Sequence, residues 1–273
     1  MDDLLLSFDA RGVATLTLNR PERHNAFDDA LIKRLTGALR QLAENLAVRV
    51  VTIRGAGRSF SAGGDINWMR RMAGMSFEEN LGDAEALARM MLLLDRFPKP
   101  TIAFVHGAAY GGGVGLAACC DIAIATDRAT FCLSEARLGI IPAAIGPYVV
   151  RAIGARQARR LMLSAETISA ATACDIGLIH EAAPEAEANA MLARVTEALL
   201  CCAPGAQKAA KDFAAYCADR PIDDALAQES ARILATLRGS SEGREGLSAF
   251  LEARAPKWIG GRSDGRVSQT ADR

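Results

Sequence analysis

The sequence predicts an α/β core of mainly parallel strands covered by helices, followed by a helical C-terminal region. Two observations support this fold class: a β-hairpin signal is followed by alternating helix and strand patterns, and the strand signal fades after Gly146. The chain has 273 residues, half of them hydrophobic, which is enough for one large domain or a main domain plus a smaller one. We expect an α/β core over residues 1–200, helices over 201–260 and a polar, flexible tail over 261–273.

The individual elements follow from apolar periodicity and from turn and cap residues. Leu4–Phe8 and Val13–Leu18 are short β-prone runs separated by a hairpin-like turn. Asp28 or Asp29 can cap a helix that continues to about Glu44 with leucines at helical spacing. Three further apolar runs are expected to be strands: Val48–Arg54, Thr101–Val105 and Asp121–Thr126. The remaining expected helices are Trp68–Met75, Phe77–Arg96, 147–163, 169–175, 186–201, 204–217, 222–237 and 241–252.

Composition and charge exclude several classes of protein. Lysines and arginines equal aspartates and glutamates, at 32 each, so the basic surface typical of a nucleic-acid-binding protein is not expected. No run approaches the roughly 18 apolar residues of a membrane span, and the acidic N-terminus differs from a signal peptide. The seven cysteines include no C-x-x-C pair, which favours reduced core residues over a metal site. We expect a cytoplasmic protein that binds neither nucleic acid nor membrane.

Two glycine-rich turns each follow a predicted strand. Residues 61–65 (SAGGD) follow Val48–Arg54, and Gly111–Gly113 follow Thr101–Val105. If these strands are neighbours in a parallel sheet, both turns lie at the same edge, where ligands bind in α/β folds. Each turn can then offer a backbone N–H to one oxygen, and Glu135 is the nearest candidate for proton transfer. Either turn alone is explained by tight local geometry, whereas the combination indicates a site for a developing negative charge.

A competing interpretation is a dinucleotide-binding fingerprint. Gly113–Ala118 fits G-x-G-x-x-A after a strand, and Asp127 follows the next predicted strand. However, the loop His106–Tyr110 separates the strand from this motif, and the helix between the strands is short for a crossover. We therefore disfavour this interpretation.

Several segments resemble the signature blocks of the crotonase, or enoyl-CoA hydratase/isomerase, superfamily. They are FSAGGDI (60–66), KPTIAFVHGAAYGGGVGLAACCDIAIA (99–125), TFCLSEARLGIIP (130–142), NRPERHNAF (19–27) and FLEARAPKW (250–258). The resemblance implies a crotonase-like spiral of ββα units with a C-terminal helical trimerisation region. It also implies an acyl-CoA thioester substrate, assembly as a homotrimer or dimer of trimers, and no cofactor besides the coenzyme A of the substrate.

The resemblance further implies catalytic roles. Gly64 and Gly112 would donate their N–H groups to the thioester oxygen, and Glu135 would move the proton. Family hydratases usually carry a second glutamate, at the position of Gly115, and several family isomerases use one glutamate. An enoyl-CoA hydratase is our first expectation; an isomerase or a catalytically silent acyl-CoA-binding homologue are the alternatives. Residues 133–160 most resemble hydratases of 3-methylglutaconyl-CoA, so we hypothesise that Gly115 removes a charge and opens volume for a carboxylated substrate.

The other candidate residues fall into two sets. The expected coenzyme A contacts are Arg23, His24, Ala62, Gly64, Asp65, Ile66, Gly112 and Lys257, the last from a neighbouring subunit. The expected acyl pocket comprises Trp68, Met72, Tyr110, Gly115, Ser134, Pro142, Ala143 and Tyr148. Asp65 is expected mainly to cap a helix and Asp121 to fix a turn. His106 is expected either to line the pocket or to be a satisfied buried histidine, and Arg137 either to form a surface ion pair or to meet a substrate carboxylate.

Overall fold

The structure is a computed structural model that describes residues 2–259, and its chain divides into two compact units. The first unit ends at Thr196 and the second begins at Glu197, four residues before the boundary expected from the sequence. The predicted tail, 261–273, lies outside the described residues. No helix within 2–259 is long and apolar enough to span a bilayer.

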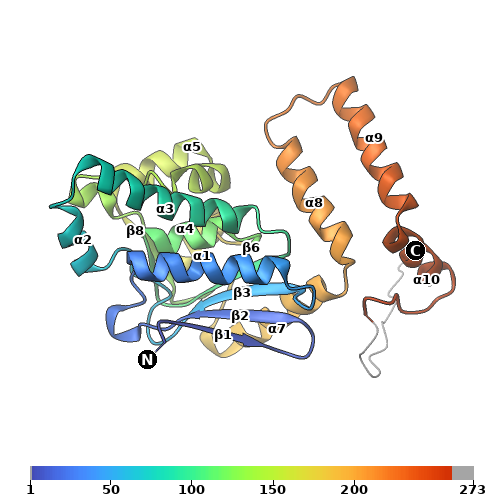
Figure 1. The fold of residues 1–273 in the computed structure, drawn as a ribbon, viewed down its shortest axis with the longest axis horizontal. Coiled ribbons are helices and arrows are strands. Elements are labelled where there is room, and N and C mark those ends of the chain that lie inside the picture. Colours follow the sequence, from blue (N-terminus) through green and yellow to red (C-terminus); the bar gives the residue numbers. More distant parts are fainter. Residues whose placement is uncertain (1, 260–273) are drawn as a thin grey trace. The chain divides into compact units, whose positions relative to one another are not determined.

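The first unit is built on a six-stranded sheet (Figure 1). Its order is β1 (Leu4–Phe8), β2 (Val13–Leu18), β3 (Val50–Gly55), β4 (Thr101–Val105), β6 (Ile122–Thr126) and β9 (Glu181–Ala183). The β1–β2 hairpin is antiparallel and every other pairing is parallel. β3 and β4 are direct neighbours, which confirms the premise that the two glycine turns follow adjacent strands.

A second, three-stranded sheet runs beside the first. It contains β5 (Ala108–Tyr110), β7 (Thr130–Cys132) and β8 (Thr167–Ser169), and Ser61 adds an isolated bridge to Ala109. The chain passes from β4 to β5 and from β6 to β7, so it alternates between the sheets and spirals as the resemblance implied. The sequence analysis missed β5, β7, β8 and β9 because each has only three residues.

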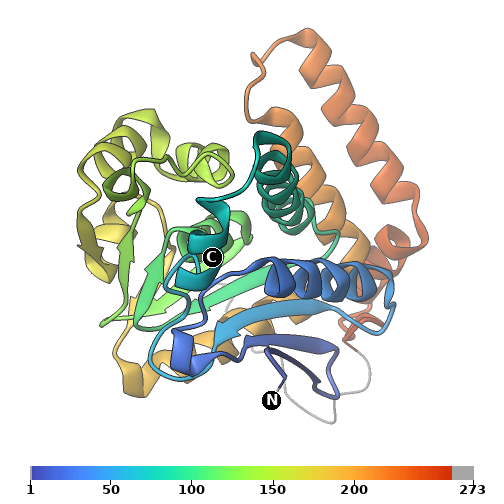
Figure 2. The ribbon, with the colours of Figure 1, turned by 60° about the vertical axis from the view of Figure 1, so that its left-hand side comes forward.

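Helices of the first unit pack on these sheets. α1 (Asp29–Glu44) and α3 (Phe77–Asp95) lie side by side in Figures 1 and 2. The leucine stripe of α1 is buried, and Asp28 is its N-cap because its carboxylate accepts a hydrogen bond from Leu31 N. The other helices are α2 (Ile66–Met72), α4 (Gly112–Cys119), α5 (Gly146–Ser164), α6 (Ala170–Asp175) and most of α7 (Glu185–Leu200).

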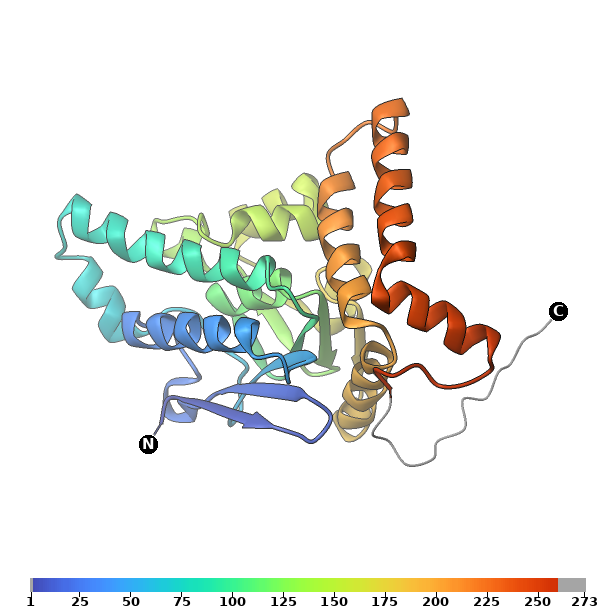
Figure 3. The ribbon, with the colours of Figure 1, turned by 45° about the vertical axis from the view of Figure 1, so that its right-hand side comes forward.

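The second unit contains α8 (Pro204–Cys217), α9 (Asp224–Gly239) and α10 (Ser241–Leu251), all of which the sequence predicted to within two residues. Figure 3 shows α8 and α9 as neighbouring helices. Trp258 anchors the segment after α10, since its indole N–H donates to the carbonyl of Cys201 over 3.1 Å. The trimerisation role of these helices stays a prediction. Cys119, Cys120 and Cys132 are buried as expected, whereas Cys201 and Cys202 are exposed.

Candidate active site

The two glycine turns are in direct contact. Gly63 and Gly111 both have positive φ, +92° and +47°. A Cβ atom added to Gly63 would lie 3.3 Å from the carbonyl oxygen of Tyr110, and one added to Gly111 would lie 3.7 Å from Cα of Gly63. Glycine is favoured on both sides because both residues adopt positive φ, and at Gly63 the carbonyl of Tyr110 also approaches closer than an ordinary Cβ contact.

The N–H groups of Gly64 and Gly112 are available to a ligand. Phe27 donates to the carbonyl of Gly63 and accepts from the N–H of Asp65, each over 2.7 Å. This pair of bonds is an isolated parallel β-bridge between Phe27 and Gly64, in which the N–H of Gly64 points away from Phe27. Gly112 opens α4, so its N–H belongs to the first helical turn, where no intrahelical acceptor exists. Neither N–H has an acceptor among the described residues.

Glu135 lies against the second turn. It begins a short 3₁₀ helix (Glu135–Leu138) just after β7, and its Oε1 would lie 2.9 Å from a Cβ added to Gly111. Its Oε2 is buried and makes no hydrogen bond within residues 2–259. Burial raises the pKa of Glu135, and a hydrogen bond from its own backbone N–H opposes this only in part. A carboxyl group with a raised pKa and an unsatisfied oxygen is suited to exchanging a proton with a ligand.

The volume hypothesis for Gly115 is wrong. A Cβ atom at Gly115 would lie 2.3 Å from Cγ2 and 2.9 Å from Cβ of Ile145. The buried side chain of Ile145, at the start of α5, therefore fills the space beside Gly115. The negative charge of a second glutamate is absent, as the sequence says, but the side chain of Ile145 occupies the adjacent space. Ile145 was not predicted because nothing in its local sequence indicates this contact.

Helix α2 covers Gly64. A Cβ atom at Gly64 would lie 2.7 Å from Cε of Met69 and 3.6 Å from the ring of Trp68. The indole N–H of Trp68 donates to Asp83 of α3 over 3.1 Å, which ties α2 to α3. Trp68 thus lies beside the first turn, whereas Met72 packs against the hydrophobic core and Met69 takes the position next to the glycine.

The other predicted pocket residues are more dispersed. Tyr110 bonds through its N–H to Ser61 O and through its hydroxyl to Thr130. Ser134 directly precedes Glu135 and is half-buried. Pro142 is buried, Ala143 is exposed, and Tyr148 packs against the core with Arg151 over its ring. The pocket roles of these residues stay predictions.

The predicted coenzyme A contacts divide between the two units. Four lie together in the first unit: Arg23 Nη1 is 3.4 Å from Asp65 Oδ2, and Ala62 N donates to His24 O over 2.9 Å. Ile66, which follows Asp65 in the chain, is largely exposed. Lys257 belongs to the second unit, where its Nζ is 3.8 Å from a carboxylate oxygen of Glu245.

Four polar residues have structural partners. Asp65 is confirmed as the N-cap of α2, accepting from the N–H groups of Asn67 and Trp68. Asp121 accepts from both N–H and Oγ1 of Thr101 at 2.8 Å, as expected for a residue that fixes a turn. Arg137 donates to the carbonyl of Ala165, which neither of its two predicted roles included. His106 Nε2 lies 2.9 Å from the carbonyl of Gly57.

The two-sheet spiral defines the class of protein as the crotonase superfamily, and comparison with known proteins agrees. Over 94% of the chain the structure matches an enoyl-CoA hydratase from Shewanella pealeana (44% identity, 96% of that chain, TM-score 0.91). It likewise matches AtuE of Pseudomonas aeruginosa (37% identity, 94% of this chain and all of that one, TM-score 0.89). The 2,3-dehydroadipyl-CoA hydratase of Escherichia coli K12 is 36% identical over 262 residues, 95% of this chain and 100% of its own.

The profile of the enoyl-CoA hydratase/isomerase family matches residues 9–261. The chain therefore belongs to the enoyl-CoA hydratase/isomerase family of enzymes.

Proposed function

We propose that the protein is an enoyl-CoA hydratase, which adds water to the C2–C3 double bond of a 2-enoyl-CoA thioester. One observation carries the proposal: the two glycine turns touch each other, and Glu135, whose buried Oε2 has no partner within residues 2–259, lies against Gly111 of the second turn. The names of the hydratases that the chain resembles support the same reaction.

The residues have distinct roles in this reaction. The N–H groups of Gly64 and Gly112 donate to the thioester oxygen, on which negative charge develops in the enolate-like transition state. Each such donor contributes about 3–4 kcal/mol. The oxygen of water bonds to C3 while Glu135 takes one water proton, and the same carboxyl group then gives a proton to C2. General acid–base catalysis of this kind contributes about 10²–10⁴ in rate.

For the substrate, we propose an enoyl chain with its own distal carboxylate, such as 3-methylglutaconyl-CoA. Gly115 and Ile145 leave no negative charge where family hydratases carry a second glutamate. A second carboxylate would repel that of the substrate, and the two would raise each other's pKa. A relative named for 2,3-dehydroadipyl-CoA, itself a carboxylated ester, is consistent with this choice. A homotrimer or dimer of trimers is part of the proposal.

An isomerase is the second candidate, because the chain has Gly115 where family hydratases carry a second glutamate. With Gly115 in place of a glutamate, Glu135 could remove a proton from C4 or C2 and return it to the other carbon. This reaction needs one carboxyl group and no activated water.

The test is a panel of enoyl-CoA esters, with and without a distal carboxylate, given to wild type, Glu135→Gln and Glu85→Gln. Hydration removes the absorbance of the conjugated enoyl thioester, whereas isomerisation of a 3-enoyl ester creates it. We expect hydration with a preference for the carboxylated esters, and a loss of at least 100-fold in Glu135→Gln. Glu85 is an exposed carboxylate on α3, paired with Arg89, so its variant should keep full activity. Full activity in Glu135→Gln would refute the assigned role, and preference for crotonyl-CoA would refute the substrate class.

A further inference from the structure

Phe27 contacts both Gly64 and Gly112, the two residues whose N–H groups we propose to bind the thioester oxygen. Its backbone holds the first turn through the two 2.7 Å hydrogen bonds to Gly63 and Asp65, which flank Gly64. Its ring holds the second turn, since a Cβ atom added to Gly112 would lie 3.0 and 3.1 Å from ring atoms Cδ2 and Cε2. Phe27 is only 2% exposed. One residue therefore contacts both turns, the first through its backbone and the second through its ring.

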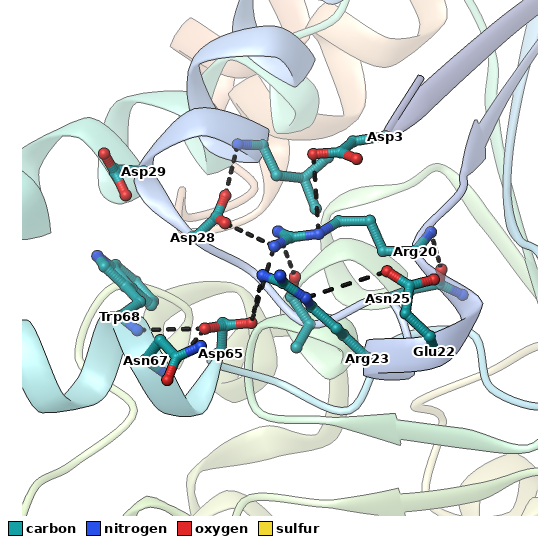
Figure 4. A network of polar contacts seen from close by, with 12 residues as sticks. Asp3, Arg20, Glu22, Arg23, Asn25, Asp28, Asp29, Asp65, Asn67 and Trp68 are labelled. Carbon is teal, nitrogen blue, oxygen red and sulfur yellow. Dashed lines mark hydrogen bonds and ion pairs between the residues drawn. The ribbon is translucent and has the colours of Figure 1, made fainter. Parts of the chain in front are cut away.

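A buried arginine fixes the loop that carries Phe27. Arg20 is 3% exposed, and its guanidinium donates to the carbonyl of Ala26 over 3.2 Å. Its Nη2 lies 2.7 Å from Asp28 and 3.7 Å from Asp65, so it joins the N-caps of α1 and α2 (Figure 4). Its Nε faces Asp3 at 3.8 Å. We call Arg20, Asp28 and Asp65 the Arg20 cluster.

The surroundings of Asp65 lower the pKa of its carboxyl group. Burial alone would raise the pKa of Asp65, but hydrogen bonds from the N–H groups of Trp68 and Asn67, together with Arg23 and Arg20, hold it below its ordinary value. Asp65 therefore stays ionised, and its attraction to Arg20 persists under ordinary assay conditions.

Asn25 holds the same loop from the other side. His24 and Asn25 both adopt left-handed backbone conformations, with φ of 51° and 56°. Such conformations persist where the surroundings enforce them. The fully buried Asn25 amide donates to the carbonyls of Ala56 and Ser59 over 2.8 and 2.7 Å, and accepts from the N–H of Arg20. Phe27 is thus fixed by contacts on two sides.

We propose that Phe27 is a positioning residue, which sets the spacing between the N–H groups of Gly64 and Gly112 and is itself held by the Arg20 cluster. The proposal rests on the proposed function, because that function assigns the two donors. Catalysis by fixed donors depends steeply on geometry, and a misplacement of about 1 Å can cost about 100-fold in rate. Removing the ring leaves both N–H groups in the protein but removes the contact that locates Gly112 against Gly64.

The kinetic test compares Phe27→Leu with Phe97→Leu. Phe97 is equally buried, at 1% exposed, but it precedes β4 at the end of that strand opposite the site. We expect Phe27→Leu to lower kcat about 10- to 100-fold with little change in KM or in the pH dependence set by Glu135. Phe97→Leu should keep kcat. Equal kcat in the two variants would overturn the proposal, and Phe27→Met provides a second variant if Phe27→Leu does not fold.

A spectroscopic test does not depend on turnover. In infrared difference spectra, the thioester carbonyl of bound butyryl-CoA, a saturated ester that cannot be hydrated, should absorb at lower frequency than in water. The shift should be smaller in Phe27→Leu, unchanged in Phe97→Leu, and reduced in Arg20→Lys, which keeps the charge but loses the forked guanidinium. A full shift in Phe27→Leu, or no shift in wild type, would overturn the positioning role. Failure of the proposed hydration alone would appear as a normal carbonyl shift without turnover.

Discussion

Replacing Gly115 by alanine should destabilise the protein, although alanine is the better helix former. Gly115 lies within α4, and the added Cβ atom would meet Ile145 Cγ2 at 2.3 Å and Met91 Cε at 3.1 Å. Overpacking of a filled core costs about 1–3 kcal/mol, and a contact this short belongs at the upper end. The gain from replacing glycine in a helix is about 1 kcal/mol. We expect a net loss of about 2 kcal/mol.

The matched control is the same substitution in another helix of the same unit. Gly37 lies within α1, and no atom lies within 4 Å of a Cβ added there. Gly37→Ala should therefore stabilise the protein by about 0.5–1 kcal/mol. Urea unfolding gives both values as shifts of the midpoint at constant slope, the two shifts having opposite signs. A stabilising Gly115→Ala would refute the conclusion that Ile145 fills this space.

The double variant Gly115→Ala, Ile145→Ala tests the contact itself. Ile145→Ala alone should cost about 2–5 kcal/mol because the side chain is buried. Since it also removes Cγ2, the closer of the two Ile145 atoms that the new Cβ would meet, the double variant should cost about 1–2 kcal/mol less than the sum of the single variants. Strict additivity would mean that the two positions do not touch. If they do touch, a glutamate introduced at position 115 needs a shorter residue at 145 before it can fold into the site.

Three further predictions concern stability. Because burial raises the pKa of Glu135, its ionised form destabilises the fold, and Glu135→Gln should raise the free energy of unfolding at pH 8. The difference between the two proteins should vanish below pH 4.5, the ordinary pKa of the carboxyl group, where Glu135 is neutral in both the folded and the unfolded protein. Equal urea midpoints at pH 8 would contradict this. Asp121→Ala leaves the buried N–H and hydroxyl of Thr101 without their acceptor and should lower the free energy of unfolding in urea by about 1–3 kcal/mol. A change within experimental error would show that water replaces the carboxylate. Ser76→Ala removes the oxygen that caps α3 and should cost about 1 kcal/mol, with Ser76→Asp as the variant that restores the cap.

The larger elements could be predicted because their signals are local. The leucines of α1 repeat at helical spacing, and the runs in β3 and β4 are long enough to be identified without knowledge of their neighbours. The three-residue strands could not be predicted in this way. β7, for example, is a strand only because β5 and β8 pair with it on either side, and both partners are distant in the sequence.

The candidate site likewise has features that local sequence predicts and features that depend on distant residues. Glycines and a glutamate at characteristic spacings can be identified in a sequence, and the resemblance to a family assigns them roles. Arg20 and Arg23 stand three residues apart, yet only Arg23 was expected to serve a ligand, and nothing local distinguishes the buried arginine from the half-exposed one. Both arginines reach Asp65, and the difference is that Arg20 also meets Asp28, the N-cap of α1, and the carbonyl of Ala26.

Gly115 and Phe27 show what a sequence motif alone does not predict, namely the space beside a glycine and the direction of an N–H group. A glycine in the sequence means that a side chain is missing at that position, but Ile145 shows that the space can be occupied from another helix. A glycine turn likewise means that an N–H is accessible, but its direction is decided by a residue such as Phe27, which lies outside both turns and contacts each of them. Two N–H groups act on one oxygen only if their separation is held to a fraction of an ångström. Catalytic strength in this fold should therefore depend as much on the packing of Phe27 as on the glycines themselves, and variation at this position among otherwise identical sites should change kcat before it changes binding.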